Sequence, residues 1–306
     1  MSENITKRQH YVWRNYLRAW SENDKIFAFL KKTNDIKRTD LMNVAQQRYF
    51  NRFYSFAELE KKFLIHMCDV KGPIKPLLDD LVRDINLFNE IKHSQKEIPP
   101  TSPKPLDEFE KNGLEKFHGI IEEYGHKIIA CRKIEDLQFF NDSISKFETL
   151  MYLCFQYFRT KKQRDSQIEN FRDEPLNIEN IYSILVIIIS ARLAQNIYFD
   201  PKIRYSLLEI SNEKEIRFIT GDQPVLNLLA DKLDEQGYAK DLIFYYPIFP
   251  KHAIKIDFTN IGELYQHHYL TDEEVDELNR KIISEYHEFL FSDSHEQLKS
   301  YTQHFV

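Results

Sequence analysis

The segment from Ile178 to Tyr198 constrains the fold most, because it is apolar on almost every side and contains neither proline nor glycine. A helix that is apolar all round cannot face water, so other elements must enclose it. Its longest apolar run, Ile181 to Ala191, is interrupted by serines and is shorter than the roughly 20 residues of a membrane span. We therefore expect a central buried helix and no association with a membrane.

Other segments carry apolar residues at helical spacing. The chain has only 7 glycines among 306 residues, which favours helices with few tight turns. The last predicted helix begins at Thr271, where Thr271 and Glu274 have the spacing of a capping box. We expect helices over residues 9–20, 56–69, 75–91, 106–124, 142–160, 178–198 and 271–289.

Short runs rich in β-branched and aromatic residues indicate strands at 25–30, 205–210, 215–219, 242–248 and 253–258. The last four runs form two pairs, the first separated by the polar residues 211–214 and the second by residues 249–252, both of hairpin length. The pattern predicts an α+β fold, with a mainly antiparallel sheet from about 25–31 and 204–258 covered by long helices. We expect one globular domain over residues 1–306, with a helical middle region at about 55–200.

Residues 92–105 contain four prolines and several polar residues, so we expect a loop there and the first site of limited proteolysis. Three cysteines in an odd, scattered arrangement indicate reduced thiols, and the polar N-terminus indicates no secretion. A cytoplasmic location follows. The net charge of −6 argues against a basic surface overall and leaves room for a local basic cleft.

The stretch from Ile216 to Val225 is an apolar strand that runs into a turn at Gly221 and ends in Asp222, Gln223 and Pro224. Strand ends of this kind are common positions for functional residues. Pro224 suits the first turn of a helix over 225–233, and Asp222 would be a good N-cap for it. A functional role and a capping role for Asp222 are equally compatible with the pattern.

Lys251 follows another predicted strand, in the same position relative to it as Asp222. If the two strands are neighbours, Asp222 and Lys251 meet at one end of the sheet as an acid–base pair, or around a divalent metal as the candidate cofactor. The alternative is a simple salt bridge. No glycine-rich phosphate loop, zinc-protease motif or nucleophile elbow occurs in the sequence.

His10, Arg14 and Arg18 are spaced four apart, so on a helix over 9–20 they would share one face. This face is either a solvated basic edge or a cationic wall for a phosphate or carboxylate. Gln156 and Arg159 lie near the end of the helix over 142–160, where Gln156 stands in an otherwise apolar sequence. A buried amide there either ties the fold together or lines a pocket.

Several blocks of the sequence together resemble the bacterial domain of unknown function 4238, in the same order across nearly the whole chain. Trp13 stands where that family usually has proline, and Gly221 stands where it usually has serine. The resemblance implies a bacterial setting and points to His10, Gln156, Arg159, Asp222 and Lys251, without implying a reaction. The blocks are His10-Tyr11-Val12 with Tyr16-Leu17-Arg18, Gln156 with Arg159-Thr160, Phe218 to Val225, and Tyr246 to Lys251.

These observations lead to two functional hypotheses. The first is an enzyme acting on a phosphate-containing substrate, such as a nuclease-like effector in phage defence, with nucleic acid or a nucleotide as partner. His10, Asp222 and Lys251 would be catalytic, and substrate would contact Arg14, Gln156, Arg159 and Gln223. The alternative is a non-catalytic protein that binds a small anion or a partner protein. The two differ in whether His10, Asp222 and Lys251 converge in one concave site.

Overall fold

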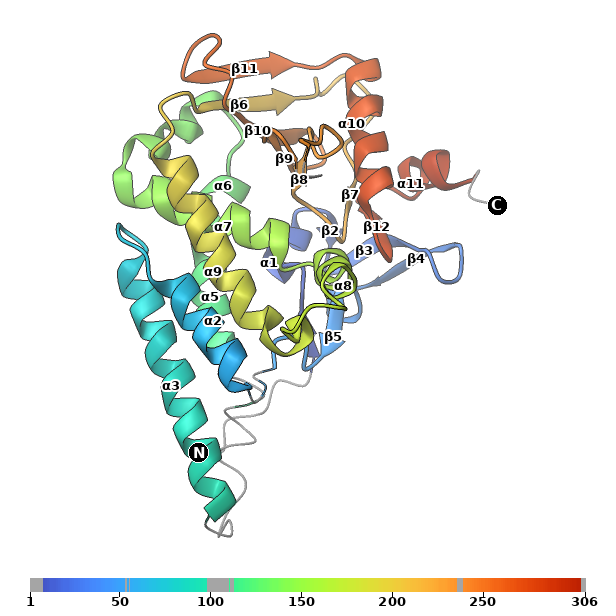
Figure 1. The fold of residues 1–306 in the computed structure, drawn as a ribbon. Coiled ribbons are helices and arrows are strands. Elements are labelled where there is room, and N and C mark those ends of the chain that lie inside the picture. The colour runs from blue at the N-terminus through green and yellow to red at the C-terminus, as the bar shows by residue number, and fades with distance from the viewer. Residues whose placement is uncertain are drawn as a thin grey trace.

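A computed structural model describes residues 8–52, 54, 56–97, 110, 113–235 and 239–303 of the chain. Figure 1 shows two β-sheets on one side of the molecule and a group of long helices on the other. The fold is α+β, as the sequence predicts. The helices are α1 (Arg14–Arg18), α2 (Glu58–Cys68), α3 (Lys75–Glu97), α5 (Glu115–Glu123), α6 (His126–Ile129), α7 (Ser143–Phe158), α8 (Lys161–Asn170), α9 (Ile178–Tyr198), α10 (Asp272–Glu285) and α11 (His295–Thr302), with 3-10 turns η1 (Leu41–Asn43) and η2 (Ile134–Asn141).

The strands fall into two five-stranded sheets and one small pair, so the single sheet expected from 25–31 and 204–258 is wrong. One sheet has the order β11-β6-β10-β9-β8, and the other joins β2, β3, β4, β12 and β7. The strands are β1 (Arg8–His10), β2 (Ser21–Glu22), β3 (Lys25–Leu30), β4 (Asp35–Asp40), β5 (Gln46–Arg48), β6 (Arg204–Glu209), β7 (Thr220–Gly221), β8 (Leu226–Asn227), β9 (Phe244–Phe249), β10 (His252–Asp257), β11 (Tyr265–Tyr269) and β12 (Phe289–Ser292).

Strand β3 lies in a sheet with strands from the far end of the chain. It forms a hairpin with β4, and its other edge pairs antiparallel with β12, so that Phe29 lies opposite Leu290. β7 pairs with the far edge of β12. Residues 25–30 and the end of the Phe218 segment therefore share a sheet, as predicted. They are not direct neighbours, because β12 lies between them, and the sequence pattern did not reveal this strand.

The predicted hairpin over 242–248 and 253–258 is confirmed as the antiparallel pair β9 and β10. The predicted hairpin over 205–210 and 215–219 is wrong, because β6 pairs with β10 and, in parallel, with β11. Residues 215–219 are irregular, and other groups hold their backbone. The amide of Phe218 donates to the carbonyl of Pro250, and the amide of Ile219 donates to the side chain of Asn279.

The helix from Ile178 to Tyr198 is confirmed residue for residue as α9. It packs along α7 and also contacts α2 and α8, and Ile187 and Ile188 are fully buried. Among the described residues, α9 is the one helix long and apolar enough to cross a membrane, and 56% of its apolar window is buried in the chain. The capping box of Thr271 and Glu274 is also confirmed, and α10 ends at Glu285.

Three predicted segments, two helices and a loop, differ in the structure. The segment 9–20 divides into β1 and the short α1, because β1 pairs with β5 while Trp13 begins the helix. Its apolar residues, including Tyr16 and Trp20, are nevertheless buried. Residues 225–233 form β8 and turns, since the Asn227 side chain bonds to Asp241, Leu229 and Ile243.

The third difference concerns residues 92–105. Helix α3 continues to Glu97, so the first six residues of the predicted loop are helical. Residues 98–105 lie outside the described residues, as do residues 106–109, 111 and 112 at the start of the predicted helix over 106–124. Within the described residues, that helix appears as α5.

Candidate functional site

The most polar group of predicted site residues surrounds a cavity of about 310 Å³, which we call the arginine cavity. It lies where β1, α1, α5 and the end of α7 meet. Cavities of this size accept small ligands. The side chains that carry charge or a titratable ring around it are Arg8, His10, Arg14, Arg18, Glu115, His118, Glu122 and Arg159.

His10 reaches the arginine cavity from the last residue of β1, where it pairs opposite Gln46 of β5. Its ring is half-buried, and apart from a weak contact with the Val44 backbone neither ring nitrogen has a hydrogen-bond partner among the described residues. Burial, followed by the charges of Arg14 and Arg159, lowers the pKa of His10 to about 4, and the contact with the Val44 backbone opposes this shift. The imidazole is therefore neutral at pH 7 and free to accept or donate a proton.

Helix α1 supplies Arg14 and Arg18, which are one turn apart and exposed. Arg18 forms an ion pair with Asp24, with 3.3 Å between Nε and Oδ1. Arg14 donates only to the thioether of Met42, and Arg8 donates to the side-chain oxygen of Asn43 at 3.3 Å. Within the described part of the chain, neither Arg8 nor Arg14 has a carboxylate partner.

Arg159 follows the last residue of α7 and is 3% exposed. Its guanidinium forms an ion pair with Glu122 of α5 and donates a hydrogen bond to the backbone carbonyl of His10. The same group lies over the ring of Phe155, 4.9 Å from its centroid. Arg159 therefore joins α7, α5 and β1 at the inner wall of the arginine cavity, and its Nε still makes no hydrogen bond to a described residue.

His118 of α5 is buried beside Arg159, with its ring edge-on to Phe155 at 4.9 Å between centroids. Burial holds the pKa of His118 well below its usual range, and the charge of Arg159 acts in the same direction. Neither of its ring nitrogens finds a partner among the described residues. Buried polar groups normally have hydrogen-bond partners, so these unpaired nitrogens mark a place where water or a ligand belongs.

Glu115 provides the second carboxylate at the arginine cavity. Burial raises the pKa of Glu115, whereas the hydrogen bond from Asn51 at 3.0 Å and the charge of Arg159 lower it. The neighbouring Glu122 carboxylate raises it again. A carboxyl group with a raised pKa beside neutral imidazoles is an arrangement that supports proton transfer.

Asp222 lies elsewhere, and the helix-capping role expected for it is wrong. No helix follows it, so it is not an N-cap. Its two carboxylate oxygens accept hydrogen bonds from the backbone amides of His287 and Glu288, between α10 and β12. Asp222 is 1% exposed and does not line the arginine cavity.

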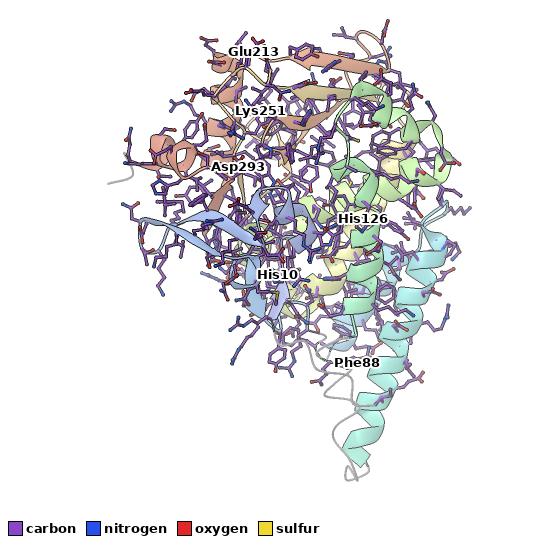
Figure 2. All side chains as sticks on the ribbon, turned by 180° about the vertical axis from the view of Figure 1, so that it is seen from behind. His10, Phe88, His126, Glu213, Lys251 and Asp293 are labelled. Atoms are coloured by element: carbon purple, nitrogen blue, oxygen red, sulfur yellow. The ribbon has the colours of Figure 1, made fainter. Side chains whose placement is uncertain are left out.

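Lys251 does not meet Asp222. Its ammonium donates to three backbone carbonyls, those of Ser211, Lys214 and Ile216. Burial lowers the pKa of Lys251, and the charge of Arg217 contributes in the same direction. Figure 2 places Lys251 near Asp293, far from His10. The predicted acid–base pair therefore does not form, and neither does the alternative salt bridge.

The two glutamines that were expected to contact substrate, Gln156 and Gln223, also do not line the arginine cavity. Gln223 accepts from the hydroxyl of Thr160 and donates to the carbonyls of Tyr157 and Val225, so it fastens the segment after β7 to the α7–α8 junction. Gln156 is fully buried, does not line the arginine cavity, and its amide has no partner among the described residues.

The structure thus brings together His10, Arg14 and Arg159, and it separates Asp222, Gln223, Lys251 and Gln156 from them. Sequence reasoning missed Arg8, Glu115, His118 and Glu122. Arg8 is two residues before His10, which on a strand places both on one face, so this signal was present in the sequence. No group of three metal-ligating side chains suited to an ion occurs within the residues that the structure describes.

Comparison with known proteins identifies the family. No curated protein and no solved structure matches the chain. The model of one protein family, described as protein of unknown function (DUF4238), matches residues 8–296, which include both sheets and the arginine cavity. This match confirms the resemblance seen in the sequence blocks, and the chain belongs to the DUF4238 family.

Proposed function

We propose that the protein binds a phosphate-containing ligand in the arginine cavity. One observation carries the proposal: Arg8 and Arg14 lie at the cavity without a carboxylate partner among the described residues. A thioether is a weak acceptor, so the contact of Arg14 with Met42 is readily exchanged for an anionic oxygen. Arginine hydrogen bonds to phosphate oxygens are charge-assisted and about twice as strong as neutral ones.

The inner wall of the cavity supports the same proposal. Both histidines are neutral at pH 7; the ring nitrogens of His118 lack partners within the described chain, and His10 has only a weak contact with the Val44 backbone. A phosphate oxygen near Arg14 would offer an acceptor to His10, and it would be attracted by the fixed charge of Arg159. Asp222 and Lys251 have no part in this site, because their polar groups are already engaged with backbone.

Binding can be tested by isothermal titration with inorganic phosphate as the probe. We expect Arg14→Gln to weaken phosphate binding by about tenfold, because it removes one charge-assisted interaction. Arg280→Gln is the matched control, since Arg280 is exposed on α10 and pairs with Asp276. Equal affinity for phosphate in both variants and the unmodified protein, or no binding by any of them, would contradict the proposal.

A second candidate function is hydrolysis of a phosphate ester in the same cavity. It is favoured by the neutral His10 and by Glu115, whose pKa burial raises. In this mechanism His10 takes a proton from the attacking water, and Glu115 returns a proton to the leaving oxygen. Arg14 and Arg159 neutralise the charge that develops on the phosphoryl oxygens.

Turnover of bis(4-nitrophenyl) phosphate, with and without added divalent metal, tests the second candidate. We expect His10→Gln to abolish release of nitrophenolate while phosphate binding persists. If the unmodified protein binds phosphate and releases no nitrophenolate in any condition, the chain is a binding protein rather than a hydrolase. A nuclease-like role in phage defence would further require that phage resistance of a bacterial host expressing the protein be lost in Arg14→Gln.

A further inference from the structure

A second hollow adjoins the arginine cavity on the other side of Arg14. Its volume is about 440 Å³, and Arg14, Arg18 and Met42 line both spaces. The residues that line only the second hollow are Asp24, Asp40, Leu41 and Asn43. The two spaces therefore share a wall, and a ligand longer than phosphate would extend from one into the other over Arg14 and Met42.

The two spaces differ in charge. Four arginines and two glutamates line the arginine cavity, whereas two arginines, Arg14 and Arg18, and two aspartates, Asp24 and Asp40, line the second hollow. Asp24 is engaged by Arg18, but the carboxylate of Asp40 makes no hydrogen bond or ion pair with any residue in the described ranges. The arginine cavity therefore has an excess of formal positive charge and the second hollow has none, so a phosphate belongs in the arginine cavity.

An unpaired carboxylate accepts hydrogen bonds from hydroxyl groups, and an acidic residue binds the ribose hydroxyls in many nucleotide sites. Met42, whose sulfur accepts from Arg14, lines both spaces and is 43% exposed. Methionine sulfur makes favourable contacts with aromatic rings. The two adjoining spaces therefore provide arginines for an anion, the Asp40 carboxylate for hydroxyl groups and the Met42 thioether for an aromatic ring.

We infer that the ligand is a ribonucleotide, with its phosphate in the arginine cavity and its nucleoside in the second hollow, where Asp40 accepts from the ribose hydroxyls. This inference rests on the proposed phosphate site and adds the class and orientation of the ligand. Arg14 and Met42 lie beneath the junction of phosphate and sugar. Asp40 acts as a specificity residue that selects a sugar phosphate over free phosphate.

The experiment compares inorganic phosphate, ribose 5-phosphate and adenosine 5′-monophosphate by isothermal titration. Asp40→Asn is compared with Asp35→Asn, an exposed aspartate at the other end of the same strand β4 that does not line the hollow. We expect the nucleotide to bind at least about tenfold more tightly than phosphate, since it makes added contacts with Asp40 and Met42. Asp40→Asn should lose about tenfold in nucleotide affinity and none in phosphate affinity, and Asp35→Asn should lose neither.

The possible failures are distinguishable. If phosphate binds through Arg14 but the nucleotide binds no more tightly, or Asp40→Asn matches Asp35→Asn, the nucleotide inference is wrong and the phosphate site stands. If neither phosphate nor nucleotide binds, the proposed function and this inference are both wrong. Thermal unfolding of the two variants should coincide, because both aspartates are exposed at the ends of one strand.

Discussion

The carboxylate of Asp222 accepts a hydrogen bond from the backbone amide of His287 at 2.8 Å, although the two residues are 65 positions apart. The second oxygen accepts from the amide of Glu288 at 2.7 Å, and the amide of Asp222 itself donates to the carbonyl of Phe289. The residue after β7 is thus fastened to the turn that leads from α10 into β12. The Asp222 carboxylate therefore has a structural contact at a sheet edge that the sequence pattern did not reveal.

We predict that Asp222→Ala lowers the free energy of unfolding by about 1–3 kcal/mol, because it leaves two partly buried amides without their acceptor. Urea denaturation at pH 7 measures the change. Asp231→Ala is a suitable control, since Asp231 is exposed in a turn. An unfolding midpoint that does not move in Asp222→Ala would show that the carboxylate does not hold this turn.

Stability should also depend on pH through Asp222. Burial raises the pKa of Asp222 from 3.8 to about 6 in the folded chain, although the hydrogen bonds from His287 and Glu288 oppose the rise. Between about pH 4 and pH 6 the folded protein holds a proton that the unfolded chain has released. The contribution of this carboxyl to stability is therefore largest below about pH 4 and falls as the pH rises to about 6.

The measurement is the difference in unfolding free energy between the unmodified protein and Asp222→Asn, taken from pH 4 to pH 8 in urea. Asn does not titrate, and all other titrating groups are the same in the two proteins. Their contributions therefore cancel, and the difference reports on the titration of Asp222. We expect the difference to decrease by a few kcal/mol at most up to about pH 6 and then to level off. A difference that is flat, or that increases with pH, would contradict the raised pKa.

Local signals explain the parts of the fold that the sequence predicted well. Helix α9 is apolar all round, α10 begins with a capping box, and β9 and β10 flank a short turn, so each is encoded by neighbouring residues. The pairing of β3 with β12 joins opposite ends of the chain, and no local pattern specifies such a partner. For the same reason, local sequence could not show that Asp222 follows an edge strand of the sheet that contains β12.

The candidate site likewise contains residues that the local sequence revealed and residues that it could not reveal. His10 and Arg14 are close in sequence, and Arg159 stands at the end of a predicted helix and in a block that resembles the family, so all three were found. His118 and Glu122 reach the cavity only because α5 packs against α7 near Arg159. The predicted pairing of Lys251 with Asp222 is wrong, because a lysine after a strand looks the same in sequence whether it faces a carboxylate or three backbone carbonyls.

We predict that Lys251→Met loosens residues 211–216 without changing phosphate binding. The substitution keeps the aliphatic stem and removes the donor to the carbonyls of Ser211, Lys214 and Ile216. Hydrogen–deuterium exchange should therefore accelerate across this segment, with a loss of about 1–3 kcal/mol in global stability. Lys255→Met, in the same hairpin and paired with Asp257, should leave exchange in residues 211–216 unchanged. Equal exchange in both variants would assign no structural role to Lys251.

A pair of glycines in or beside α5 gives the sharpest test of the packing around the site. A Cβ at Gly125 would lie 2.5 Å from the ring of Tyr152, which is fully buried and hydrogen-bonds to Tyr246 at 2.7 Å between hydroxyls. A Cβ at Gly119, inside α5, would meet no atom within 4 Å. The backbone at Gly125 has an ordinary φ of −79°, so the obstacle to alanine there is the Tyr152 ring, which supplies the three nearest atoms, and not backbone strain.

We therefore expect the substitution of glycine by alanine to change stability in opposite directions at the two positions. Gly125→Ala should destabilise the protein by about 1–3 kcal/mol, because Tyr152 cannot move without breaking its contacts with Trp13 and Tyr246. Gly119→Ala should stabilise it by about 0.5–1 kcal/mol, because alanine is a better helix former and the site has room. Urea denaturation of the two variants measures both values. Shifts of the same sign would mean that α5, and with it His118 and Glu122, does not pack on α7 as the structure has it.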